Sequence, residues 1–491
     1  MKNNKFCGGN MMKNKRLKSA AKRKNMKKVL CVTVSIVMLL GICGGFPATA
    51  ASDYMIVSPY EDVVWSGDHA WGAYKGVLHS HTTWSDADED LPTMVKEYYS
   101  LGYDFLANSD HAVTGVAWNK EPELVSPYWY QYFLGNKLRV LTDEEYEAIT
   151  SGAYNNRGYG MTCITGANEL NHLTLSKNHV NGYFLPSGVG NGFAGYYPGK
   201  NITDPSGYVG ENEVGIENAL RFVEDNGALS HINHPGDVLD STRHPEVVTD
   251  PETIGFYGDL LLKYKSCLGI EALNEVNSVT RYDRVLWDQL LMYCLPYGKT
   301  VIGFSNTDAH SLLNCDSSFS VFMMKENTQE EVKKTMQSGA FFCVSKCLPG
   351  NDVYEIGPKE DIDVRGKGIP YPMFNSVEVN GHKVSVTVEN ADEIQWIANG
   401  KVIMKGEVGT DPIVLDLDAV EGSEDFRYIR AEILGEGGIC LTQALVIDDG
   451  TQPLAFHAKA HTPSLVERII LFLRGLKLYN IFVEIFRAVR K

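Results

Sequence analysis

The sequence predicts an α/β protein: a distorted, TIM-like barrel of about seven or eight β/α units, followed by a small C-terminal β-sandwich. Three observations predict this fold class. Short apolar runs alternate with stretches of helical period between residues 72 and 346. From residue 372 onward the apolar residues alternate with period two. Histidine and acidic residues recur at the ends of successive predicted strands, where a parallel barrel gathers its functional groups.

The composition narrows the function classes. The 491 residues are 44% apolar and 22% charged, which excludes an intrinsically disordered chain. A polytopic membrane protein is excluded because the sequence has only one long apolar run. The net charge is -16, but residues 1–50 carry eleven basic and no acidic residues, so the remainder stands at -27. A body this acidic repels phosphate backbones, and we expect no binding to nucleic-acid duplexes. An anionic substrate would need a local cation, either arginines or metal ions.

Residues 1–50 are predicted to be a signal peptide behind a basic leader. Lys27 and Lys28 precede an apolar run over 29–46, and Ala48-Thr49-Ala50 supplies the small residues of a cleavage site. We therefore expect export, with the protein extracellular or associated with the cell surface or membrane. An uncleaved anchor is the alternative, because the apolar run can just span a bilayer. Residues 51–71 are predicted to be a linker.

Seven cysteines follow residue 50, and none forms a CxxC pair. An odd and sparse set of this kind does not indicate a disulfide scaffold or a zinc ribbon. We expect most of these cysteines to be small buried hydrophobic residues.

The barrel is predicted over residues 72–350. Strands are expected at 74–78, 103–107, 161–166, 179–184, 228–232, 268–273, 300–304 and 341–344. Helices are expected at 91–101, 213–224, 253–265, 282–297 and 329–337. Because strands and helices alternate this regularly, the strands should be parallel.

Two segments interrupt the alternation. Residues 112–160 form an insertion rich in aromatic residues, which either caps an active site or packs as a subdomain. Residues 186–210 are rich in glycine but lack the Lys-Ser/Thr of a nucleotide-binding loop, so a long surface loop is expected.

The C-terminal part is predicted to be accessory. Alternating apolar residues and the hairpin signals Asn380-Gly381 and Asn399-Gly400 indicate a β-sandwich over 370–450, without a cluster of catalytic residue types. Residues 463–491 carry six basic and two acidic residues around an apolar face. This pattern favours a basic amphipathic helix on a membrane surface, and a helix docked on the protein is the alternative.

The chemistry is predicted at the strand ends. His79-Ser-His81 closes the first strand, and residues two apart in an extended chain point the same way, so both imidazoles can bind one cation. Core packing would not select the many other polar residues at these ends, because unpaired buried polar groups are costly. A metal site is therefore predicted, and a Ser-His-Asp triad is disfavoured because no Gly-x-Ser-x-Gly elbow is present. The further strand-end residues are Asp86, Asp110, His111, Glu169, His172, His179, His231, His234, Glu271, Asn274, Asp308 and His310.

Seven motifs in this region resemble the polymerase-and-histidinol-phosphatase (PHP) family of metal-dependent phosphoesterases, and the export signal and sandwich resemble its secreted carbaryl-hydrolase-like branch. The motifs, in the family's order, are HSHTTWSD at 79–86, SDH at 109–111, GANE at 166–169, HVNGY at 179–183, HPG at 234–236, EALN at 271–274 and TDAH at 307–310. The resemblance covers about residues 72–346 and implies a distorted β/α barrel with two or three zinc, manganese or iron ions.

The resemblance also implies a ligand set. One metal would take His79, His81, Glu169 and Asp308, and Glu169 would bridge to a second. The second metal would use His179, favoured over His172, and His234, favoured over His231, for the proline and glycine that follow it. A third would use Asp86, His111 and His310.

The expected function is hydrolysis of a small-molecule phosphate ester by a hydroxide bridging two metal ions. Asp110 could orient His111 or shuttle a proton, and Asn274 could support the ligands. Arg243 and Arg281 lie just beyond strand ends and could hold phosphate, with surface salt bridges as their alternative role. Two other functions stay open: hydrolysis of a carbamate, amide or carboxylic ester on the same metals, as amidohydrolases also begin with His-x-His, and a surface binding protein whose catalytic core has decayed.

Overall fold

The computed structural model describes residues 54–111, 113–122, 138–170, 178–186, 213–275, 280–350 and 356–458. The predicted signal peptide, the 463–491 helix, residues 112 and 123–137 of the aromatic insertion and nearly all of the 186–210 loop lie outside these residues. Within them, no helix combines the length and apolar character that crossing a bilayer requires. The described residues from Tyr54 onward belong to one compact unit.

The first strands of the predicted barrel belong to one large sheet. β2 (Gly72–Val77), β3 (Phe105–Ala107) and β4 (Thr162–Ile164) are parallel. Helix α2 (Leu91–Ser100) connects the first two and buries Leu91, Met94 and Val95. On the other side of β2, the sheet continues antiparallel through β10 (Ser318–Met324) and β11 (Phe341–Ser345), with helix α9 (Gln329–Ser338) between them.

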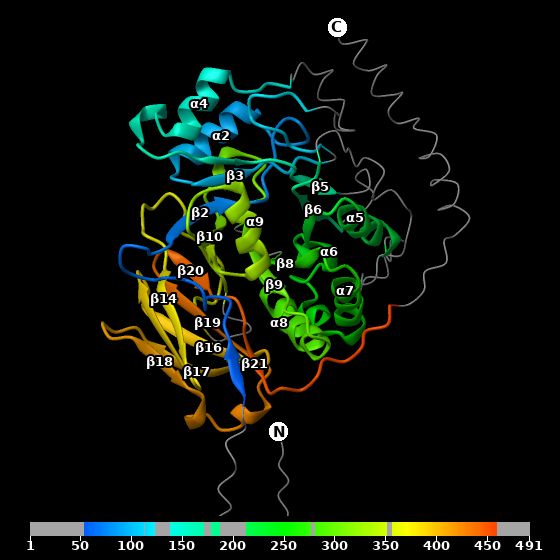
Figure 1. Cartoon of the computed structure of the whole chain (residues 1–491), viewed down its shortest axis with the longest axis vertical. Helices are drawn as coiled ribbons and strands as arrows, with labels where there is room; N and C mark the ends of the chain where they lie inside the picture. Colours follow the sequence, from blue (N-terminus) through cyan, green and yellow to red (C-terminus); the bar gives the residue numbers. More distant parts are fainter. Residues whose placement is uncertain are drawn as a thin grey trace, which may run out of the picture. The chain divides into compact units, whose positions relative to one another are not determined.

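A separate five-stranded sheet holds the middle of the chain. Its order is β5-β6-β7-β8-β9, and only the pairs β7–β8 and β8–β9 are parallel. Helices α5 (Glu213–Asp225), α7 (Pro251–Lys263) and α8 (Asp283–Cys294) lie beside it (Figure 1). The strands are Asn168–Leu170, Val180–Tyr183, Leu229–Ile232, Cys267–Asn274 and Ile302–Asn306.

The closed TIM-like barrel predicted from the sequence is not observed, because the described strands form open sheets. Where the large sheet meets the five-stranded sheet, side chains satisfy the backbone groups of Leu78 in place of a neighbouring strand. The Leu78 N–H donates to Asn306 Oδ1 at 2.9 Å, and the Leu78 carbonyl accepts from the Tyr183 hydroxyl at 3.1 Å. Two isolated backbone bridges, Ser80 with Ala309 and His111 with Glu169, join the strand ends. The protein is thus mixed α/β, and the prediction of all-parallel strands is wrong.

The C-terminal strands form two layers. β14 (Met373–Asn380), β15 (Lys383–Glu389) and β18 (Ile413–Asp416) make a three-stranded sheet. The others extend the large sheet, because β20 pairs with β11. Both hairpin predictions are confirmed, since β14–β15 and β16–β17 turn at Gly381 and Gly400, whose φ angles of 59° and 71° suit glycine. The strands of the second layer are β16 (Glu393–Ala398), β17 (Lys401–Glu407), β19 (Tyr428–Gly435), β20 (Gly438–Leu441) and β21 (Leu445–Asp448).

The remaining elements are short. β1 (Met55–Val57) pairs with β21, and β12 (Cys347–Leu348) pairs with β13 (Ile362–Asp363). The aromatic insertion contains helix α4 (Asp143–Ser151), which begins with a capping box between Thr142 and Glu145. All seven cysteines beyond residue 50 are buried and free, as predicted.

A buried ion-pair network joins helix α8 to strand β19. The Arg430 guanidinium donates to both oxygens of Asp288, at 2.8 and 2.7 Å, and to Glu432 at 2.6 Å. Arg284 donates to the other oxygen of Glu432 at 2.8 Å. Because all four side chains are buried, this network fixes the C-terminal strands against the α8 helix.

Candidate metal centre

The strand ends bring nine ligand-type side chains together. Two histidines and an aspartate follow β2, a histidine follows β3, and a glutamate lies in β5. The others lie beside the ends of β6, β7 and β9. Seven of the nine, all except His79 and His81, line a cavity of about 370 Å³ together with Asp237, Asn274, Glu275 and Thr280. The nine side chains are those of His79, His81, Asp86, His111, Glu169, His179, His234, Asp308 and His310.

The first group consists of His79, His81, Glu169 and Asp308, whose ligand atoms all lie within 4.8 Å of one another. The Nε2 atoms of the two histidines are 3.1 Å apart. Asp308 Oδ1 lies 3.1 Å from each of them, and Glu169 Oε2 lies at 3.3 and 3.0 Å. This is the set predicted for the first metal.

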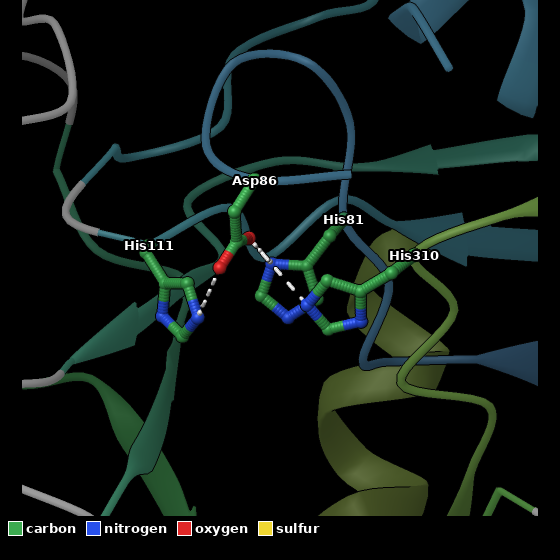
Figure 2. A group of neighbouring side chains, drawn as sticks. All are labelled: His81, Asp86, His111 and His310. Atoms are coloured by element: carbon green, nitrogen blue, oxygen red, sulfur yellow. Dashed lines mark ion pairs between the residues drawn. The ribbon is translucent and has the colours of Figure 1, made fainter. Parts of the chain in front are cut away.

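A second group surrounds Asp86, which comes from the loop after β2. Its carboxylate faces His111 at 3.4 Å, His310 at 3.4 Å and His81 at 3.7 Å, with the side chains arranged as in Figure 2. These four residues form one candidate ligand set. The structure therefore adds His81 to the three residues that the sequence assigned to a third metal.

Glu169 connects the groups through its two oxygens. Oε2 faces His79, His81 and His111, while Oε1 lies 2.8 Å from His179 Nδ1 and 3.4 Å from His234 Nε2. A carboxylate in this position can bridge two neighbouring cations, which is the role predicted for it. His111 takes part in two groups, a sharing that the sequence assignment did not contain.

Of the two histidines that the sequence offered at the end of β7, His234 lines the cavity and His231 does not. His231 points away from the cavity: its Nε2 lies 2.8 Å from the Tyr183 hydroxyl, and its ring stacks on Phe304. His234 instead faces Glu169 and Asp308. The rejected alternative for the other position, His172, lies outside the described residues.

Two of the site residues have an unfavourable backbone. His234 has a φ angle of 24° and Asp308 a φ angle of 45°, both in a region that L-residues rarely adopt. Such conformations cost of order 1–3 kcal/mol each and persist where the surroundings hold them. Here the Asp308 N–H donates to the His79 carbonyl at 3.0 Å, and the His234 N–H donates to Glu271 Oε2 at 2.9 Å.

Asp110 does not orient His111, in contrast to the prediction. Its carboxylate accepts hydrogen bonds from the Thr82 N–H at 2.7 Å, the Thr82 hydroxyl at 2.9 Å and the Ser85 hydroxyl at 2.7 Å. Ser85 Oγ in turn lies 3.2 Å from His81 Nδ1. Asp110 therefore acts on His81, through Ser85, because the loop after β2 folds back over the end of β3.

Arg243 and Arg281 do not line the cavity. Arg243 is exposed and pairs with Asp240 at 3.0 Å, and Arg281 pairs with Asp361 at 3.2 Å. Both therefore form salt bridges, the alternative role that the sequence allowed, with the Arg243 pair at the surface and the Arg281 pair largely buried. Asn274 does line the cavity, where its amide donates to Glu271 Oε2 at 2.8 Å.

The electrostatics of the first group favour bound positive charge. Burial lowers the pKa of His81, but hydrogen bonds and charges from Asp308 and Glu169 outweigh it and raise the pKa to about 10. The same balance of burial against carboxylates raises the pKa of His79 and brings that of His234 to about 10. The buried carboxylates thus hold protons on the imidazoles where a metal ion would supply the charge.

The donor set fits a divalent transition metal. Nitrogen and oxygen atoms about 2.0–2.1 Å from a tetrahedral ion stand about 3.3 Å apart, close to the separations in the first group. Two imidazole Nε2 atoms facing each other at 3.1 Å can share at most one proton, whereas both can donate lone pairs to a cation. Asp308 Oδ1 is buried as well, and it lies 3.1 Å from both of these nitrogens. Histidine with carboxylate ligands suits zinc, manganese and iron.

No family model and no curated protein matches the chain. Among solved structures it is similar to a two-domain protein from Bacteroides vulgatus containing a predicted PHP-like metal-dependent phosphoesterase, at 14% identity and a TM-score of 0.37, over 76% of this chain and 96% of that one. It is also similar to a proposed metal-dependent phosphoesterase from Bifidobacterium adolescentis, at 12% identity and a TM-score of 0.27, over 49% and 89%. A third, the lesion-specific endonuclease PfuEndoQ from Pyrococcus furiosus, has 16% identity and a TM-score of 0.27, over 54% and 56%.

Proposed function

We propose that this protein is a metal-dependent hydrolase that cleaves a small-molecule phosphate ester, in the manner of the PHP family. The observation that carries the proposal is the position of Glu169, whose two oxygens face two different sets of imidazoles. Ions held on either side of one carboxylate would be neighbours. Divalent ions lower the pKa of bound water and neutralise the charge that develops on a phosphoryl group.

The chain's own residues would hold the ions and shape access to them. His79, His81, Glu169 and Asp308 would hold the first ion, and Glu169 with His179 and His234 the second. Asp86, His111 and His310 would hold a third, with zinc, manganese or iron as candidates in each position. The His310 side chain is 37% exposed and that of Asp86 27%, so this group lies at the open side of the cavity.

Activity on a substrate panel tests the proposal. Purified protein is stripped with a chelator, reloaded separately with zinc, manganese or iron, and assayed on aryl phosphate diesters and monoesters. The expected result is metal-dependent release of the aryl alcohol, with kcat/KM reduced at least about 100-fold in His81→Ala. Arg243→Ala is the control and should retain activity, since Arg243 lies outside the cavity lining.

The same panel separates the alternatives. Aryl carboxylic esters, carbamates and anilides are included at equal concentration. Metal-dependent cleavage of these compounds without phosphate chemistry would replace the phosphoesterase proposal with a carboxyl-group hydrolase. Full metal occupancy with no hydrolysis of either class would favour a binding protein.

Export and membrane association remain part of the proposal. Residues 1–50 and 463–491, which carry those predictions, lie outside the described residues. Fractionating cells that express the full chain, followed by N-terminal sequencing, tests both. Cleavage after Ala50 with recovery outside the cell is expected, and an intact N-terminus in the membrane fraction would indicate an anchor instead.

A further inference from the structure

Glu271, on strand β8, lies directly behind the first imidazole of the centre. Its Oε1 is 2.8 Å from His79 Nδ1, and its side chain is fully buried. The Nδ1–H of His79 can therefore donate to Glu271, which leaves Nε2, the nitrogen directed at Glu169 and Asp308, to bind a metal ion. Glu271 itself belongs to none of the candidate ligand sets among the described residues.

The same carboxylate holds three further groups. Oε2 accepts from the backbone N–H of His234 at 2.9 Å and from the Asn274 amide at 2.8 Å. Oε1 accepts from the Asn306 amide at 3.0 Å. Asn306 in turn accepts from the Leu78 N–H, next to His79. Glu271 thus ties the ends of β2, β7 and β9 to β8 at the edge where the two sheets meet.

Resting on the proposed metal centre, we propose that Glu271 is a positioning residue that fixes the tautomer of His79 and the backbone of His234. It thereby sets the affinity of the centre for its metal ions. A carboxylate that receives the second N–H of a ligand histidine orients the ring and raises its basicity, and its loss typically weakens metal binding about 10–100-fold. The hydrogen bond from the His234 N–H to Glu271 also stabilises the unfavourable φ angle of His234, a conformation that the backbone would otherwise leave.

The two histidines of His79-Ser-His81 differ in this support. His79 meets its carboxylate directly, whereas His81 reaches Asp110 only through Ser85, with 3.2 Å between Nδ1 and Oγ. Removing the charge of Glu271 should therefore weaken metal binding more than removing that of Asp110.

The test is Glu271→Gln, which keeps the size of the side chain and removes its charge. Glutamine cannot replace the carboxylate, because its NH2 group would face a donor of His79, Asn306, His234 or Asn274. Metal-free protein is titrated with Zn²⁺ or Mn²⁺ against a competing chelator, and the variant should bind about 10–100-fold more weakly. In nitrogen-15 NMR of the metal-loaded protein, the slowly exchanging Nδ1–H signal of His79 should be lost.

Glu432→Gln is the matched control. Glu432 is also fully buried, but it pairs with Arg284 and Arg430 away from the cavity. Its variant should lower the unfolding midpoint while metal affinity stays within threefold of the wild type. A loss of affinity as large as that of Glu271→Gln would show a general effect of fold stability and overturn the positioning role.

The outcomes separate the two proposals. A wild-type protein that binds no metal would defeat the proposed function. A wild type that binds metal, with Glu271→Gln binding equally well, would defeat the positioning role alone. If Glu271→Gln does not fold, Glu271→Asp tests the positioning role instead. Its carboxylate is one carbon shorter and should weaken metal binding at least about threefold. Unchanged metal binding in this variant would overturn the inference.

Discussion

Replacing Arg430 by alanine should remove about 3–5 kcal/mol of stability. The fully buried Asp288 carboxylate would lose the two hydrogen bonds that it accepts from the Arg430 guanidinium, at 2.8 and 2.7 Å. It would keep the hydrogen bond from the Tyr428 hydroxyl at 2.7 Å. Glu432 loses one bond at 2.6 Å but keeps Arg284 and Gln395. The main cost is therefore a buried Asp288 charge without its cation, and breaking a buried pair in this way costs about 3–5 kcal/mol.

Urea unfolding followed by tryptophan fluorescence measures this cost. Trp287 contacts the network, with its ring 5.1 Å from the Arg430 guanidinium carbon. Lys334→Ala is the control, because the ion pairs of this exposed residue within the described part of the chain are those with Glu330 and Glu331, and the change should alter stability by less than about 1 kcal/mol. The double variant Arg430→Met with Asp288→Leu should recover much of the loss, since it leaves no uncompensated Asp288 charge. A loss below about 1 kcal/mol for Arg430→Ala would refute this reasoning.

Two further predictions concern the metal centre and the strands. Because the pKa of His81 is about 10 in the metal-free fold, above its ordinary 6.5, its proton stabilises that fold at acid and neutral pH, and this contribution is lost only as the pH rises through about 10. Metal must displace that proton, so affinity should rise with pH from 6 to 8, with proton release seen by calorimetry in buffers of different ionisation enthalpy; an affinity independent of pH would contradict this. Gly269→Ala should leave little soluble protein, because its Cβ would stand 1.8 Å from the Ile302 carbonyl oxygen in the β8–β9 ladder. Gly255→Ala, in α7 with nothing within 4 Å, should instead stabilise the protein by about 0.5–1 kcal/mol, and equal yields of the two variants would argue against the β8–β9 register.

The sequence predicted local structure well where the period was strong. The helix expected at 213–224 is α5 (Glu213–Asp225), and the strand expected at 341–344 is β11 (Phe341–Ser345). The sequence did not predict β10 (Ser318–Met324) or the three-residue strand β5 (Asn168–Leu170).

The hydrophobic period of the sequence could not show whether the strands close into a barrel. The pattern shows that strands and helices alternate, but the pairing of strand edges depends on contacts far apart in the chain. β10 runs antiparallel beside β2, and Asn306 and Tyr183 satisfy the backbone of Leu78 where a ladder would otherwise close. Nothing in the spacing of these residues predicts that role.

In the site, residue type and position at a strand end were enough to select the nine side chains of the candidate centre, but not the carboxylates of Asp237 and Glu275, which also line the cavity. Their supporting partners were harder to predict. The sequence places Glu271 at a strand end but gives it no role, because its 2.8 Å contact with His79 Nδ1 depends on the fold. Asp110 was assigned to the adjacent His111, whereas the fold directs it to Ser85.

The central claim is that these side chains hold metal ions, and anomalous X-ray scattering from crystals grown with Zn²⁺ or Mn²⁺ tests it most directly. Two or three anomalous peaks are expected in the cavity, one of them about 2.0–2.2 Å from His79 Nε2, His81 Nε2 and an oxygen of Asp308. Glu169 should lie between two of the peaks. A cavity without an anomalous peak under metal excess, or peaks confined to the protein surface, would contradict the account.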